Sequence, residues 1–110
     1  MDTPFKLVVV YANEETKRHS ASLADVVVKL VHDRHLSART LVTKAVAGGY
    51  ENGEVSTHHL LDLSYNLPLK IEVLLPAGEA EELVEALAEI VTEGVVAVQD
   101  VDVRVHRPRG

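Results

Sequence analysis

The stretch LPLKIEVLLP, residues 67–76, carries the clearest structural signal in the chain. Apolar side chains occupy every second position from Leu67 to Leu75, and Lys70 and Glu72 stand between them. Successive side chains of a β-strand point to opposite faces, so this alternation predicts a strand with one buried face. Pro68 stands near the start of the strand, where a missing amide donor is tolerated.

A helix and a last strand are predicted on the C-terminal side of this stretch. After Pro76 and Gly78, apolar residues recur at helical spacing, with glutamates on the opposite side (apolar Leu83, Val84, Leu87, Ile90, Val91; acidic Glu81, Glu85, Glu89). Gly94 is expected to end this helix in the left-handed cap position. The last strand is expected to turn Val101, Val103 and Val105 inward, ahead of a basic tail from residue 107 to 110.

The N-terminal half repeats the same scheme. Residues 5–11 contain a continuous apolar, mostly β-branched run typical of a central strand. Ser22 and Asp25 form a helix-start signature, and the apolar spacing that follows predicts a helix from residue 22 to 35. Residues 39–46 alternate again and predict a strand with a more polar face.

The predicted order is strand, helix, strand, repeated once, which favours a ferredoxin-like βαββαβ sandwich of the α+β class. In this fold two helices cover one face of a four-stranded antiparallel sheet. The other face then needs polar cover or a partner, and the apolar content favours a homo-oligomer. At 110 residues, the chain is expected to form a single domain over residues 1–110.

Composition excludes several functional classes. The chain has 17 acidic and 11 basic residues and no cysteine, which excludes disulfide frameworks, thiolate metal sites and cysteine nucleophiles. The acidic balance argues against nucleic-acid binding. No apolar run approaches the ~18 residues of a membrane helix, and the N-terminus resembles no secretion signal, so a cytoplasmic location is expected.

The segment between the two halves, residues 47–66, is longer than a simple connection between strands requires. The first part, residues 47–54, is rich in turn formers and predicts a mobile loop. The second part, residues 55–64, is apolar enough to re-enter the sheet. A long hairpin with a solvated tip and a ligand-responsive loop are equally compatible with this composition.

Two groups of residues are candidate anion ligands. Lys44 precedes Gly48 and Gly49, so a cation and two unhindered amides could meet a phosphate, although a turn beside a solvated charge fits the same pattern. Arg104, Arg107 and Arg109 are suited to bidentate phosphate contacts or, alternatively, to a solubilising tail. The Walker A order is absent, so nucleotide hydrolysis is not expected.

The histidines are weaker candidates for a metal site than the lysine and arginines are for an anion site. His58 and His59 are adjacent, so on a strand their rings point to opposite faces, and a metal would need ligands from another subunit. His32 and His35 share a helix end, where capping or solvent exposure explains them. A hydrolase triad from His58, Asp62 and Ser64 lacks a nucleophile elbow and is rejected.

Several segments together resemble the DUF190 family, also called UPF0166, of the PII-like superfamily. The resemblance covers nearly the whole chain and is most specific in the Leu-Ser-x-x-Leu-Pro pattern of residues 63–68 (further matching segments 22–23, 40–50, 55–57, 60–62 and 93–96). The chain departs from the family pattern at Lys44, where an arginine is usual, at Gly48-Gly49-Tyr50, where Gly-Phe-Gly is usual, and at Ser56.

The resemblance implies a homotrimer that binds adenine nucleotides in clefts between subunits, with residues 47–66 corresponding to the T-loop of PII proteins. The ligand residues expected on this basis and from the patterns above are Lys44, Gly48, Gly49, Gly94, Val95, Arg104 and Arg107. The expected partner-contacting residues are Tyr50, Glu51, Asn52 and Gly53. The partner expected from the resemblance is a regulated protein such as a membrane transporter.

The leading hypothesis is therefore a sensor without catalysis, with AMP or ADP as an effector and no cofactor. One alternative is a metal-responsive trimer like the CutA branch of the superfamily, using His58 or His59. Another is a ligand-free structural subunit whose long loop completes an oligomer interface. An enzyme is not expected, because no acid and base pair with suitable spacing emerges.

Overall fold

The computed structural model describes residues 3–13, 17–18, 21–57 and 67–109. Four strands and two helices make up the body of the molecule: β1 (Thr3–Asn13), α1 (Leu23–Asp33), β4 (Arg39–Lys44), β7 (Pro68–Pro76), α2 (Ala77–Ile90) and β8 (Val95–Val103). Four short strands complete the described elements: β2 (Lys17–Arg18), β3 (Ala21–Ser22), β5 (Ala47–Gly49) and β6 (Val55–Thr57).

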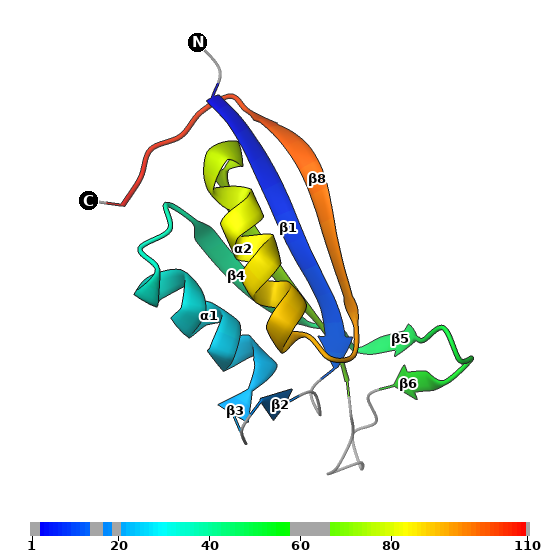
Figure 1. Ribbon diagram of the computed structural model, residues 1–110. Helices are drawn as coiled ribbons and strands as arrows, with labels where there is room; N and C mark the ends of the chain where they lie inside the picture. Colours follow the sequence, from blue (N-terminus) through cyan, green and yellow to red (C-terminus); the bar gives the residue numbers. More distant parts are fainter. Residues whose placement is uncertain (1–2, 14–16, 19–20, 58–66, 110) are drawn as a thin grey trace.

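The four long strands form one sheet in the order β4-β7-β1-β8, and every neighbouring pair is antiparallel. Both helices lie on the same face of this sheet (Figure 1). This is the predicted ferredoxin-like α+β fold, with the β-branched run of β1 at a central position as expected. No helix in the described part of the chain is long and apolar enough to cross a membrane.

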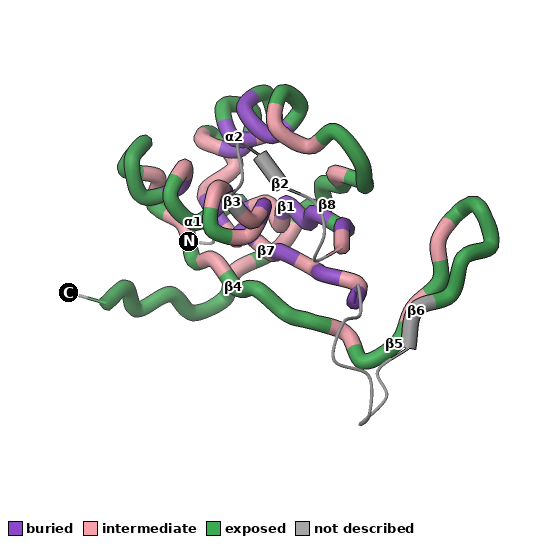
Figure 2. Tube along the Cα trace, turned by 90° about the horizontal axis from the view of Figure 1, so that it is seen from below, coloured by how far each residue is buried: buried purple, intermediate pink, exposed green. Residues whose placement is uncertain are grey.

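The predicted alternation of residues 67–75 places one face of β7 in the core. Ile71, Val73 and Leu75 are fully buried, while the residues between them are only half-buried. They pack against apolar side chains of both helices, among them Leu23, Val27, Leu83 and Leu87. Burying one such side chain contributes roughly 1.5–3 kcal/mol to stability. Figure 2 shows buried residues on β1, β7 and α2, where the sheet and the helices pack together.

Helix α1 begins as the sequence predicts. The Ser22 hydroxyl accepts a hydrogen bond from the Asp25 amide at 3.1 Å, which satisfies one of the free N–H groups of the first turn. On the exposed side, Lys29 and Asp33 form an ion pair at 2.6 Å across one helical turn. The hydrogen bond from Lys29 lowers the pKa of Asp33.

The C-terminal half differs from the prediction in two respects. Helix α2 ends at Ile90 with Val91 as its C-cap, so Gly94 lies in the following turn and is not the helix cap. The last strand also begins earlier, at Val95, and ends at Val103, so Val105 lies beyond it with 64% of its surface exposed. By register Val101 pairs with Phe5, which puts it on the face opposite the helices rather than in the core.

The segment after β4 forms a hairpin of its own. Strand β5 pairs with β6, so residues 55–57 do not re-enter the main sheet as the sequence suggested. The remainder of that predicted strand, residues 58–64, lies outside the described residues. The hairpin projects from the end of the sheet where β1 stops and β8 starts (Figures 1 and 2).

The sheet face opposite the helices, called the open face here, is partly apolar. The strand register places Leu41, Glu72, Val9 and Ala97 in one row across it. At one end of the face, the His106 ring stacks edge-on against Phe5 with centroids 5.4 Å apart, and Phe5 is buried. The tail after β8 therefore covers part of this face.

Candidate ligand-binding site

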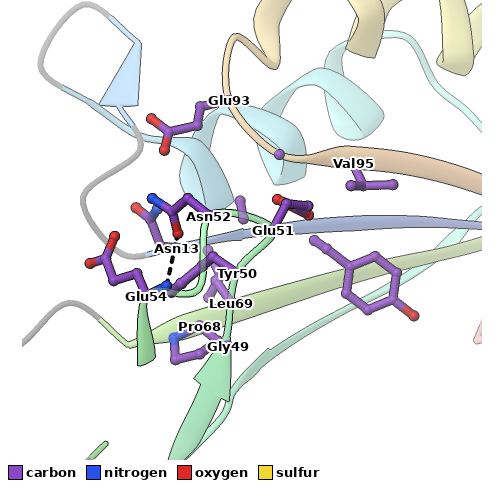
Figure 3. A pocket seen from close by; sticks show the side chains of 13 residues that line it. Asn13, Gly49, Tyr50, Glu51, Asn52, Glu54, Pro68, Leu69, Glu93 and Val95 are labelled. Carbon is purple, nitrogen blue, oxygen red and sulfur yellow. Dashed lines mark hydrogen bonds between the residues drawn. The ribbon is translucent and has the colours of Figure 1, made fainter. Parts of the chain in front are cut away.

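A pocket of about 710 Å³ lies between the β5–β6 hairpin and the adjacent end of the sheet. This hairpin pocket takes one wall from the hairpin and the other from the end of β1, the start of β7 and the turn before β8 (Figure 3). Its volume falls within the range of small-molecule sites. The described residues that line it are Tyr11, Ala12, Asn13, Gly49, Tyr50, Glu51, Asn52, Glu54, Pro68, Leu69, Glu93, Gly94 and Val95.

The wall on the sheet side depends on a close backbone approach at Gly94. A Cβ atom at this position would lie 2.3 Å from the Tyr11 carbonyl oxygen, and the φ of Gly94 is +136°. Both facts require glycine. The absent side chain lets the turn before β8 lie directly on β1, which brings Glu93 and Val95 beside Tyr11 and Asn13.

The wall on the hairpin side is a defined turn. The Tyr50 amide donates to the Glu54 carbonyl and the Gly53 amide donates to the Tyr50 carbonyl, each at 2.9 Å. Gly53 has a φ of +87°, which fits a three-residue hairpin loop with a left-handed third residue. The Asn52 side chain accepts a further hydrogen bond from the Glu54 amide at 2.9 Å, which the dashed line in Figure 3 marks.

Contacts with Pro68 attach the hairpin to the sheet. The Ala45 amide donates to the Pro68 carbonyl at 2.9 Å. A Cβ atom on Gly48 would lie 2.6 Å from the Pro68 ring, so Gly48 lets the base of the hairpin rest against the start of β7. These contacts hold the base of the hairpin against the start of β7.

Three of the expected ligand residues line the hairpin pocket (Gly49, Gly94 and Val95), and so do three residues that were expected to contact a partner instead (Tyr50, Glu51 and Asn52). Gly48 and Gly53 belong to the hairpin, and Lys44 ends β4 with an exposed side chain, but these three do not line it. Arg104 and Arg107 follow the far end of β8, about 27 Å along the strand from Val95. Within one subunit these arginines do not reach the pocket.

Several lining residues were not predicted from the sequence, chiefly Tyr11, Asn13, Pro68 and Glu93. Tyr11 and Asn13 end β1, and Tyr11 pairs with Val95 at the start of β8. The predicted fold already makes β1 central, so its C-terminal end had to lie beside the start of the last strand. These lining residues could therefore have been predicted from the antiparallel pairing of the first and last strands, although no sequence motif marks them.

The histidine hypothesis cannot be placed on this site. His58 and His59 lie outside the described residues. Within residues 3–13, 17–18, 21–57 and 67–109, no three His, Asp or Glu side chains gather as metal ligands would. The polar side chains among the described lining residues are three carboxylates, two asparagine amides and two tyrosines.

The sheet order and the helix pair define the ferredoxin-like α+β fold, from which the β5–β6 hairpin projects. The family model DUF190, described as an uncharacterized ACR, matches residues 5–103, and the chain belongs to this family. A comparison with functionally curated proteins gives no match.

Two solved structures share the fold. CPII, a nitrogen regulatory PII-like protein from Thiomonas intermedia K12 bound to ADP, AMP and bicarbonate, is 18% identical with a TM-score of 0.61, and the match covers 94% of this chain and 91% of that one. A DUF3240 family protein from Shewanella baltica OS155 is 19% identical with a TM-score of 0.58 over the full length of both chains.

Proposed function

We propose that this chain is a non-catalytic PII-like signalling protein of the cytoplasm that binds a small adenine nucleotide, such as AMP or ADP. The observation that carries the proposal is the double wall of the hairpin pocket, one side from the hairpin and one from the sheet. A ligand that contacts both walls binds one hairpin position more tightly than others and shifts the population toward it. The nucleotide acts as an effector and not as a cofactor.

The similarity to CPII supports the choice of ligand class, because that protein was solved with ADP and AMP bound. In the proposed mechanism, Lys44, which does not line the pocket of its own subunit, contacts the phosphate in the cleft between subunits, together with the backbone amides of Gly48 and Gly49. The hairpin state selected by the nucleotide is the state that a regulated protein, such as a membrane transporter, recognises through Tyr50, Glu51, Asn52 and Gly53.

The proposed assembly is a homotrimer with the nucleotide sites in clefts between subunits. Large apolar side chains remain exposed on the open face, including Leu41 at 58% and Tyr11 at 51%. A second copy packed on this face removes them from water. Arg104 and Arg107 lie far from the pocket of their own subunit. In the proposed trimer they contact the ligand in the pocket of a neighbouring subunit.

Thermal unfolding with adenosine, AMP, ADP and ATP tests the proposal. A ligand at 100 times its dissociation constant adds about 2.7 kcal/mol to stability, which for a chain of this size raises the midpoint by roughly 10 °C or more. Lys44→Ala is expected to weaken AMP and ADP binding and to leave adenosine binding unchanged. Lys29→Ala, an exposed lysine on α1, is the matched control. No shift with any adenine ligand at millimolar concentration contradicts the proposed function.

A further inference from the structure

The hairpin pocket has an unusual charge for a nucleotide site. Three carboxylates, Glu51, Glu54 and Glu93, line it, and no lysine, arginine or histidine does so among the described residues. All three glutamates are exposed to solvent. The pocket of one subunit therefore presents a negative potential to any phosphorylated ligand.

The backbone holds these carboxylates on two opposing segments. Glu51 and Glu54 belong to the hairpin turn fixed by the Tyr50, Gly53 and Asn52 hydrogen bonds. Glu93 precedes Gly94, whose backbone lies against the Tyr11 carbonyl. Figure 3 shows Glu54 and Glu93 on one side of the pocket and Glu51 on the other, toward Val95. Carboxylates thus stand on both sides of the pocket, and its lining also includes the apolar residues Pro68, Leu69 and Val95, against which a nucleobase can pack.

A negative wall acts on ligands in proportion to their charge. AMP and ATP share the adenosine moiety, so contacts to the base and ribose favour them equally, whereas ATP carries additional phosphate charges that the carboxylates repel. Cations brought by Lys44 or by a neighbouring subunit attract phosphate, but the carboxylates still lower the gain from each added phosphate. The repulsion between exposed charges falls as salt increases.

We infer that Glu51, Glu54 and Glu93 are specificity-determining residues that make the hairpin pocket select nucleoside monophosphates over triphosphates. This inference rests on the proposed function, since it concerns the same pocket and ligand class. The hairpin and the turn before β8 together discriminate between ligands of different charge. The two hairpin glutamates contribute only while the hairpin stands against the sheet, so selection and hairpin position are linked.

Isothermal calorimetry with metal-free adenosine, AMP, ADP and ATP at low ionic strength tests the inference. The natural protein is expected to bind AMP more tightly than ADP and ADP more tightly than ATP. The triple variant Glu51→Gln/Glu54→Gln/Glu93→Gln is expected to narrow the AMP-to-ATP affinity ratio by roughly ten-fold and to leave adenosine affinity unchanged. In the natural protein, higher salt is expected to narrow the same ratio.

The matched control removes the same formal charge elsewhere. Glu81, Glu85 and Glu89 are exposed on α2 and do not line the pocket, so their replacement by glutamine should leave the AMP-to-ATP ratio as it is in the natural protein. An unchanged ratio in the pocket variant, or ATP binding as tight as AMP binding in the natural protein, overturns the inference while the proposed function stands. Absence of binding by all four ligands overturns both.

Discussion

At the scale of single residues, position 94 has the strictest requirement for glycine. Its φ of +136°, and the 2.3 Å that would separate an added Cβ from the Tyr11 carbonyl oxygen, leave no room for a side chain. Gly94→Ala is expected to destabilise the fold by roughly 3 kcal/mol, because it combines backbone strain with a clash against a central strand. Urea unfolding at constant protein concentration measures the loss.

Gly78 provides the control for this substitution. It lies in the first turn of α2, and a Cβ there meets nothing within 4 Å. Gly78→Ala is expected to leave stability unchanged or raise it by up to about 1 kcal/mol, since alanine is the better helix former. Equal effects of the two alanines would contradict the close approach at Gly94.

A second residue-scale prediction concerns Asp100, whose carboxylate accepts a hydrogen bond from the Lys6 ammonium at 2.6 Å. This bond, followed by the attraction of the Lys6 charge, lowers the pKa of Asp100 in the folded chain. The ionised pair therefore stabilises the fold above the unfolded pKa of about 3.9, and the contribution disappears as the pH falls through the lower folded value.

Lys6→Met is expected to raise the pKa of Asp100 to its ordinary value, as followed by NMR titration of the carboxyl carbon. Lys70→Met serves as the control, because Lys70 pairs with Glu72 on β7 at 3.5 Å and does not pair with Asp100. A titration of Asp100 that is the same in the natural protein and in Lys6→Met would refute the assignment.

At the scale of elements, the contact between Gly48 and Pro68 sets where the hairpin stands. Gly48→Ala brings a Cβ within 2.6 Å of the Pro68 ring and is expected to cost roughly 1–3 kcal/mol. Pro68→Ala removes the obstructing ring atom, so the double variant should be more stable than the sum of the single effects indicates, by about 1 kcal/mol. Chemical unfolding of all four proteins gives this coupling.

Gly49 separates this clash from a general intolerance of alanine in β5. A Cβ there has the Glu54 carbonyl oxygen as its nearest neighbour, at 3.8 Å, which is an ordinary contact. Gly49→Ala should therefore cost less than Gly48→Ala and show no coupling with Pro68→Ala. Additive effects of Gly48→Ala and Pro68→Ala would exclude the contact as the determinant of hairpin position.

The sequence predicts those elements best whose two faces meet different surroundings. Strand β7 is buried on one face and half-buried on the other, so its alternation is clear and its limits are predicted to within a residue. Strand β8 lies at the sheet edge, and its first residues, Val95 to Val98, are apolar on both faces and mostly exposed. Without a contrast between faces, the pattern does not mark where the strand starts, and Gly94 resembles a helix cap.

The pocket was predictable only in part for a related reason. The hairpin residues Gly49 to Asn52 stood out because local turn chemistry marks them in sequence. Asn13 and Glu93 lie far apart in the chain and become neighbours of the same pocket only through the pairing of β1 with β8. The arginines after β8 were predicted to bind phosphate because of their positive charge. The length of β8 separates them from the pocket in the same subunit.

At the scale of the whole molecule, the open face is the surface of the sheet that neither helix covers. The helices bury one face of the sheet, whereas on the opposite face the exposed Leu41 shares a row with Glu72, the buried Val9 and the exposed Ala97. Charged Lys70 and Glu72 pair with each other on this face at 3.5 Å. A mostly apolar row whose one charged residue is paired is compatible with burial against a second copy, which is the assembly proposed above.

Leu41→Glu tests this assembly, because it places an unpaired charge in the proposed interface. Light scattering after size exclusion should give about 36 kDa for the natural protein, three times the 12.0 kDa chain, and a mass near 12 kDa for the variant. Val28→Glu is the control, since Val28 is also exposed, at 45%, but lies on α1. A Leu41→Glu protein that keeps the trimer mass, or a natural protein that is monomeric, would place the subunit contacts elsewhere and remove the proposed route of Arg104 to a neighbouring pocket.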